Sequence, residues 1–241
     1  MARDDALYCV AKDSLGQISY ILISALCFVP AIVFHEVAHG VAANALGDPT
    51  AKVAGRLTLN PLAHIDMFGT VVLPLLMAMM GGPVFGYAKP VPYNPANFAN
   101  KRTGDLIVGL AGPAANFVMA IIGALLTWAL VWSMPAWQGA YAAGGIAAAG
   151  FEFLFTFLPS FTVINLYLMF FNLLPIPPLD GSSIFAVLVP ERHLGAYYAI
   201  ERYAMPIFLV VAFVLPYATG FNPFAWYLNA TAGALAGVML P

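Results

Sequence analysis

Long apolar stretches, separated by short polar segments, dominate the chain. Five stretches contain no Asp, Glu, Lys or Arg: 14–34, 67–88, 106–151, 153–179 and 203–241. A helix needs roughly 20 apolar residues to cross ~30 Å of hydrocarbon. The pattern therefore predicts an all-α polytopic membrane protein.

The strongest predicted spans cover about 18–45, 106–133 and 151–174, and a further span covers about 203–217. The first should end at Gly47-Asp48-Pro49, because glycine and proline stop helices. The tail, about 224–240, is long enough either to cross the membrane or to lie in its interface, and the pattern does not decide between the two. Residues 84–97 are rich in proline and aromatic residues and predict an extended chain.

Two polar-side segments are less regular. Residues 50–60 alternate, with Val53, Leu57 and Leu59 apolar, which predicts a short strand or hairpin. Residues 66–82 are apolar but short and contain Pro74, so they either span the membrane or form a re-entrant segment. The re-entrant alternative is favoured, because it places the basic residues 52, 56, 89, 101 and 102 on one face, and the positive-inside rule makes that face cytoplasmic.

Composition agrees with a membrane location. Of the 241 residues, 62% are hydrophobic and 8% are charged, whereas soluble domains carry about 25% charged residues. The net charge of -2 and the lack of a basic run argue against nucleic acid as a partner. The first apolar stretch has no small-residue cleavage site, so we expect a retained helix. Cys9 and Cys27 are expected to be two small hydrophobic residues.

One motif carries metal chemistry. His35-Glu36-Val37-Ala38-His39 lies within the first predicted span. Histidines at i and i+4 project from one face of a helix and suit a single Zn²⁺, and the Glu between them suits a general base. Ionisable groups are expensive in a membrane helix, so three within one turn require a cation or a hydrogen-bond network.

A catalytic zinc site needs a third protein ligand. Asp180 is the only acidic residue between Glu152 and Glu191, and prolines precede it in Pro175-Ile176-Pro177-Pro178. Because prolines unwind a helix, the carboxylate can point sideways from the fourth span. A turn in which Asp180 caps the next helix is the alternative. One Zn²⁺ per chain, held by His35, His39 and Asp180, is the prediction.

Three motifs resemble the site-2 protease family of intramembrane zinc metalloproteases: 35–39, Ala111-Gly112-Pro113-Ala114-Ala115-Asn116-Phe117, and 172–181. Residues 60–66 and 86–92 are similar to its compact prokaryotic branch. The resemblance covers about 18–188 and implies a three-helix catalytic core there. Together with the additional helices expected at about 199–241, to which the resemblance does not extend, this predicts a single domain over 1–241. The resemblance also implies Glu36 as the base and cleavage of transmembrane protein substrates near the cytoplasmic face of a prokaryotic inner membrane.

Other polar residues leave alternatives open. Asn116 and Asn172 are candidates for stabilising an oxyanion or binding substrate, or else for bonding between helices. His64 could orient substrate, bind a second metal or cap the segment from Asp66. Gly112 is predicted to permit close helix packing.

Two other functions remain to be tested: a zinc-binding membrane transporter and a non-proteolytic scaffold. Sequence gives neither the substrate nor the oligomeric state. A membrane helix must be unwound to be cut, so we also expect that 52–60 or 84–93 could pair with an extended substrate.

Overall fold

The structure is a computed structural model that describes residues 2–67, 88–177 and 179–241, and within these ranges it contains helices and no strand. Three long helices form its body: α1 (Ala2–Ala45), α4 (Lys101–Ala142) and α5 (Gly145–Asn172). Each contains a segment long and apolar enough to cross a membrane. The prediction of an all-α membrane protein is confirmed.

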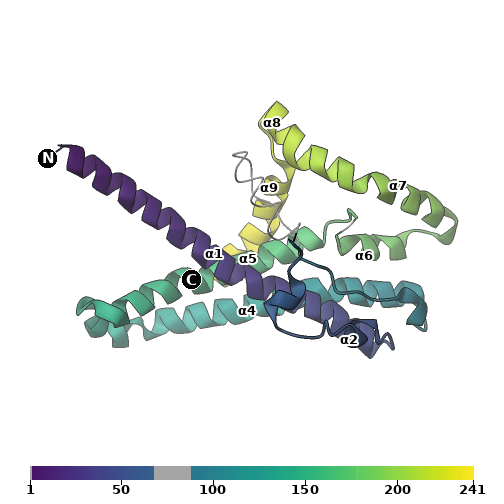
Figure 1. Cartoon of the computed structure of the whole chain (residues 1–241), viewed down its shortest axis with the longest axis horizontal. Helices are drawn as coiled ribbons and strands as arrows, with labels where there is room; N and C mark the ends of the chain where they lie inside the picture. The colour runs from purple at the N-terminus through teal and green to yellow at the C-terminus, as the bar shows by residue number, and fades with distance from the viewer. Residues whose placement is uncertain (1, 68–87, 178) are drawn as a thin grey trace.

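The helices α4 and α5 run side by side in opposite directions, and α1 crosses both (Figure 1). Gly144 and Gly145, with φ of 73° and 78°, turn the chain between α4 and α5, a conformation that favours glycine. All three helices differ from the predicted spans: α1 begins near residue 2, and α4 is longer at both ends. Helical turns beyond an apolar core are not marked by a hydropathy pattern.

The chain leaves α1 as predicted, because Gly47 adopts a φ of 96°. The predicted strand or hairpin at 50–60 is wrong. Residues Thr50–Val53 form the short helix α2, and the alternation was misleading because Val53 and Leu59 are 83% and 56% exposed. Apolar side chains that face out of the protein mark no buried strand face.

Most of the segment at 66–82, for which a re-entrant path was predicted, lies outside the described residues. Its flanks are described. The 3₁₀ helix η1 (Pro61–His64) precedes it, and the non-helical chain 88–94, followed by η3 (Pro95–Asn97), comes after it. The two flanks meet at the C-terminal end of α1, where the Lys89 N–H donates to the His64 carbonyl at 2.9 Å. Of the extended chain predicted at 84–97, residues 88–94 form no helix, but the prediction is wrong at Pro95–Asn97, which form η3.

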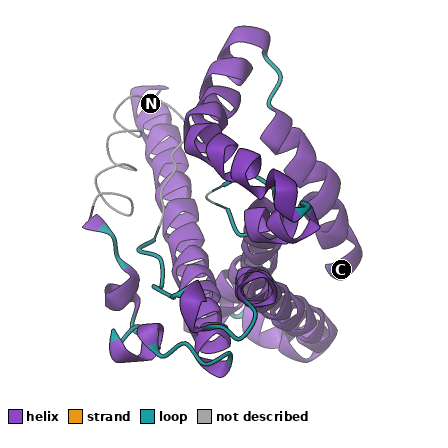
Figure 2. Ribbon diagram, turned by 90° about the vertical axis from the view of Figure 1, so that its right-hand side faces the viewer, coloured by secondary structure: helices purple, strands orange, loops and turns teal. Residues whose placement is uncertain are grey.

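The C-terminal third is helical throughout. Its elements are α6 (Gly181–Leu188), α7 (Glu191–Leu209), η4 (Val210–Val214), α8 (Leu215–Thr219), α9 (Pro223–Leu228), η5 (Asn229–Gly233) and α10 (Ala234–Met239). The segments Pro206–Thr219 and Pro223–Met239 meet at 102° and together have the length and apolarity of one broken span. The segment Pro223–Met239 packs on α5, where the Tyr167 hydroxyl donates to Oδ1 of Asn229 at 2.7 Å. Figure 2 shows α7 and α8 to one side of the long helices.

Asp48 joins the end of α1 to the chain that follows residue 88. Its fully buried carboxylate accepts the Asn94 backbone N–H at 2.7 Å, the Asn97 side-chain amide at 2.6 Å and the Thr50 backbone N–H at 3.2 Å. Burial on its own would raise the pKa of Asp48, but these hydrogen bonds, together with one from the Thr50 hydroxyl, lower it below its usual value. The ionised carboxylate therefore stabilises the fold.

We expect Asp48→Ala to lower the free energy of unfolding by about 2 kcal/mol, because buried donors lose a charged acceptor. Since the pKa of Asp48 is lower in the folded state, its contribution is complete above the unfolded value of about 4 and is lost as pH falls through the folded value. Thermal unfolding in detergent at pH 7 and at pH 3 measures both effects. If lowering the pH from 7 to 3 destabilised wild type and Asp48→Ala by the same amount, this role of the Asp48 carboxylate would be contradicted.

Candidate metal centre

Helix α1 places two histidines against a gap in α4. His35 and His39 are 5% and 8% exposed, and Gly112 of α4 lies directly opposite them. A Cβ built at Gly112 would overlap Nε2 of His39 and lie 2.5 Å from Cε1 of His35. The close approach predicted for Gly112 is thus an approach to the two imidazoles themselves.

Hydrogen bonds on the far side of each ring fix its tautomer. Nδ1 of His39 lies 2.7 Å from the Val108 carbonyl, which can only accept, so this nitrogen carries the hydrogen. Nδ1 of His35 lies 2.6 Å from Oδ1 of Asn116. The Asn116 amide nitrogen donates to the Ala31 carbonyl at 3.1 Å, which leaves its oxygen as the atom facing His35. In neutral imidazoles, both Nε2 atoms therefore present lone pairs.

Asp180 completes a group of three ligand atoms. Its Oδ2 lies 3.1 Å from Nε2 of His35 and 3.4 Å from Nε2 of His39, and the two Nε2 atoms are 3.0 Å apart. With both rings neutral and their hydrogens on Nδ1, no hydrogen lies between the nitrogens, and Oδ2 of Asp180 is buried without a hydrogen-bond partner. Three lone pairs this close repel one another unless a cation lies among them. Ligands ~2.0 Å from a tetrahedral metal lie ~3.3 Å apart, so these residues fit a metal ion.

The position of Asp180 follows from the break between α5 and α6. Gly181 has no room for a side chain, since a Cβ there would overlap the carbonyls of Leu173 and Leu174. At the other end of α6, the Arg102 guanidinium donates to the carbonyls of Ala186, Val187 and Val189. The helix that follows Asp180 is therefore held at both ends, by the chain leaving α5 and by α4.

Glu36 lies between the two histidines on α1. Its Oε2 accepts the Val91 backbone N–H at 2.9 Å. Residues three apart share a face of a helix, so Glu36 and His39 project to the same side. Glu36 therefore lies in the helix turn that carries both histidines, and a carboxylate is a suitable proton acceptor.

The other predicted residues have different surroundings. Asn116 uses both amide hydrogens within the protein, because its nitrogen also donates to Oδ1 of Asn165 at 3.0 Å, so an oxyanion role would require one of these bonds to break. Asn172 donates to the Leu168 carbonyl of its own helix at 3.0 Å. His64 is 2% exposed, and its Nε2 lies 2.9 Å from the Thr58 carbonyl. The roles predicted for Asn172 and His64 remain predictions.

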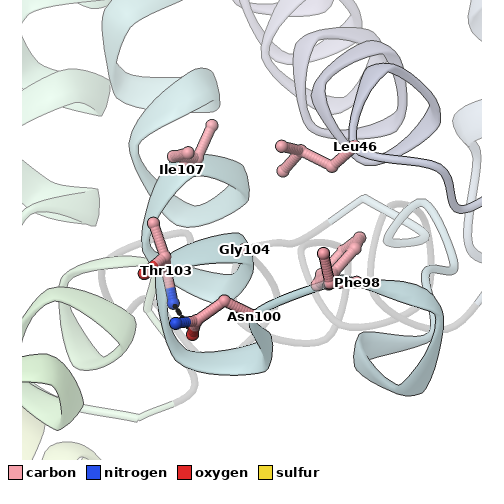
Figure 3. A pocket seen from close by; sticks show the side chains of 7 residues that line it. Leu46, Phe98, Asn100, Thr103, Gly104 and Ile107 are labelled. Carbon is pink, nitrogen blue, oxygen red and sulfur yellow. Dashed lines mark hydrogen bonds between the residues drawn. The ribbon is translucent and has the colours of Figure 1, made fainter.

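An apolar hollow of about 190 Å³ lies between the end of α1 and the start of α4. Figure 3 shows the side chains of Leu46, Phe98 and Ile107 gathered around it. Its lining contains no carboxylate, histidine or cysteine. This hollow therefore supplies no metal ligand and no acid or base.

Sequence reasoning missed the groups that hold the site. The Val108 carbonyl and the Val91 N–H are backbone atoms, which no residue type announces. Asn165 is different, since it is a fully buried amide in the apolar helix α5. The reasoning that singled out Asn116, that a polar amide is costly in a membrane span, applies equally to Asn165.

The fold and these residues define a helical membrane protein with a His-His-Asp group that could hold a metal ion. Comparison with family models matches residues 137–215, which include Asp180, to "Peptidase family M50". No solved structure gives a significant match.

Curated relatives match most of the chain. "Putative zinc metalloprotease YwhC" of Bacillus subtilis is 36% identical over 203 residues, covering 84% of this chain and 83% of the relative. "Putative zinc metalloprotease Rip2" of Mycolicibacterium smegmatis is 31% identical over 219 residues, covering 89% and 75%. The chain belongs to the M50, or site-2 protease, family.

We expect Gly112→Ala to reduce bound metal well below one ion per chain, because the added methyl group occupies the space of the imidazoles. Overpacking of this kind also costs about 1–3 kcal/mol of stability. Gly139→Ala is the matched control, since Gly139 lies in the same helix with nothing within 4 Å of its Cβ position. The metal content of the purified proteins tests this expectation. One metal ion per chain in Gly112→Ala would refute the steric argument.

We expect Asn116→Leu to weaken metal affinity about 10- to 100-fold, the usual effect of losing a partner behind a metal-bound histidine. Without the Asn116 oxygen, nothing holds the hydrogen of His35 on Nδ1. Competition with a chromogenic chelator measures the affinity. Thr127→Val is the control, because Thr127 is equally buried in α4 and bonds only to Gly123 of its own helix. An affinity of Asn116→Leu equal to that of the control would show that the tautomer does not matter.

Proposed function

We propose that the chain is a single-domain intramembrane zinc metalloendopeptidase that hydrolyses peptide bonds of transmembrane segments. The observation that carries this proposal is the convergence of three ligand atoms, from His35, His39 and Asp180, with Glu36 between the two histidines in the same turn of α1. The donor set of two imidazoles and one carboxylate is typical of catalytic zinc. The names of the relatives support zinc as the metal.

Zinc, Glu36 and the two histidines have different parts in the proposed reaction. Bound zinc supplies a Lewis acid that polarises a peptide carbonyl and lowers the pKa of water toward about 7. Glu36 takes a proton from the attacking water and passes it to the leaving amine. His35 and His39 present unprotonated Nε2 atoms because Asn116 and Val108 hold the hydrogens on Nδ1.

The depth of the site supports cleavage within the bilayer. His39 lies six residues before the end of α1 at Ala45, about 9 Å along the helix axis. Lys52, Arg56 and Lys89 lie at that end, and α4 begins there with Lys101 and Arg102. By the positive-inside rule, we place this end, and the active site near it, toward the cytoplasm of a prokaryotic cell with the protein in its inner membrane.

The main experiment compares wild type with Glu36→Gln and Asp180→Ala, each purified in detergent. Zinc content and cleavage of a panel of transmembrane peptides are measured together. We expect wild type to hold one zinc per chain and to cleave. Glu36→Gln should keep its zinc but lose cleavage by about 10²–10⁴-fold, as expected for a general base, and Asp180→Ala should lose zinc.

The alternatives give other results. A zinc transporter or a scaffold needs no base between the histidines, so Glu36→Gln would leave zinc flux into proteoliposomes or partner binding intact. Zinc bound by wild type without Glu36-dependent cleavage of any peptide would overturn the proposed peptidase.

A further inference from the structure

The chain from Lys89 to Asn97 is fastened along the C-terminal half of α1. The Lys89 N–H bonds to His64, and the buried guanidinium of Arg56 donates to the Lys89 carbonyl at 2.7 Å. Further along, Asn94 and Asn97 both donate to Asp48. These contacts hold the segment on both sides of Val91.

Val91 is seated in a notch of α1 made by a glycine. Its side chain is 5% exposed, and a Cβ at Gly40 would lie 2.9 Å from Cγ1 of Val91 and 2.5 Å from the Leu57 side chain. Gly40 directly follows the His-Glu-x-x-His motif. The absence of a side chain at this position lets the Val91 backbone approach the helix turn that carries Glu36.

The neighbouring residues leave one hydrogen-bond donor at this point. Pro90 and Pro92 flank Val91, and proline has no backbone N–H. Between residues 90 and 92, the Val91 N–H is therefore the only backbone donor, and it bonds to Oε2 of Glu36 at 2.9 Å. A residue before proline is also confined to extended backbone, so the sequence fixes both the number of donors and the local conformation.

The same arrangement argues against substrate pairing along this edge. The backbone N–H of Lys89 is used by His64, that of Val91 is used by Glu36, and the residues at 90 and 92 have none. An added strand needs a row of free donors and acceptors. The described chain at 89–92 offers no free N–H for it, so another role has to explain why the segment lies against Glu36.

We propose that Val91 is a positioning residue whose backbone N–H holds the Glu36 carboxylate by one oxygen, leaving the other oxygen to handle the proton. This inference rests on the proposed peptidase function. A carboxylate fixed at one oxygen keeps one orientation, whereas a free glutamate samples several rotamers. The hydrogen bond therefore raises the fraction of molecules in which the base is aligned.

The first test uses Val91→Pro and Val91→Ala. Proline keeps three side-chain carbons but deletes the N–H, whereas alanine keeps the N–H but deletes two carbons. We expect Val91→Pro to lower kcat about 10- to 100-fold, the usual range for misplacing a catalytic group, with KM and zinc content close to wild type. Val91→Ala should retain the larger kcat. The opposite order, or equal kcat values, would overturn the proposal and leave Val91 as a packing residue.

If Val91→Pro does not fold, the α-hydroxy acid analogue of valine can be placed at position 91 instead, which replaces the backbone amide by an ester. The ester keeps the side chain and replaces only the N–H. Its kcat should fall as in Val91→Pro, and an ester variant with wild-type kcat would refute the role of the hydrogen bond.

A second measurement does not depend on cleavage. Hydrogen exchange of the Val91 amide, followed by NMR in nanodiscs, should be slow in wild type and in Glu36→Gln, because glutamine keeps an acceptor oxygen. Exchange should accelerate at least about tenfold in Glu36→Ala, since the acceptor is gone. Identical exchange in all three proteins would refute the contact even if no substrate is found. Failure of wild type to cleave, with the expected exchange pattern, would refute only the peptidase function.

Discussion

The repulsion among three converging lone pairs is the constraint on which the site depends. Neutral imidazoles and a carboxylate packed this closely at low dielectric are unfavourable without a cation. Two of the donors come from one turn of α1, and the third comes from the break between α5 and α6. Helix packing brings them together only because Gly112 leaves the space open. Metal binding and packing of the helices are therefore coupled energetically.

Each imidazole has a hydrogen-bond partner at Nδ1, which is the Val108 carbonyl for His39 and the Asn116 side chain for His35. A carbonyl oxygen has two lone pairs, so Val108 can serve both α4 and His39. Asn116 cannot rotate its amide freely, because Ala31 and Asn165 accept from its nitrogen. Three helices thus fix the tautomer of His35 through bonds that never touch the metal, which is how an outer layer of contacts tunes a metal site.

Sequence was sufficient where a costly side chain lay in an apolar stretch. His35 and His39 were chosen for their i, i+4 spacing in an apolar span, and Asp180 as the only acidic residue between Glu152 and Glu191. The structure brings the three into one group. The sequence also predicted the three long helices, although not the residues at which they begin and end. The strand expected at 50–60 failed because Val53 faces out of the protein. The sequence could not predict the role of backbone groups such as the Val91 N–H, since the direction of a backbone N–H depends on tertiary packing.

The two histidines and Glu36, the proposed base, share α1 but are held by different parts of the chain. The helix pair α4 and α5 orients the imidazoles, whereas the segment from Lys89 to Asn97 contacts Glu36. That segment is fastened by Asp48 and Arg56, which lie at the end of α1 outside its apolar core. The hydrogen bonds that hold the segment involve neither imidazole, so a displacement of the segment would move the Glu36 carboxylate without breaking the bonds that orient His35 and His39.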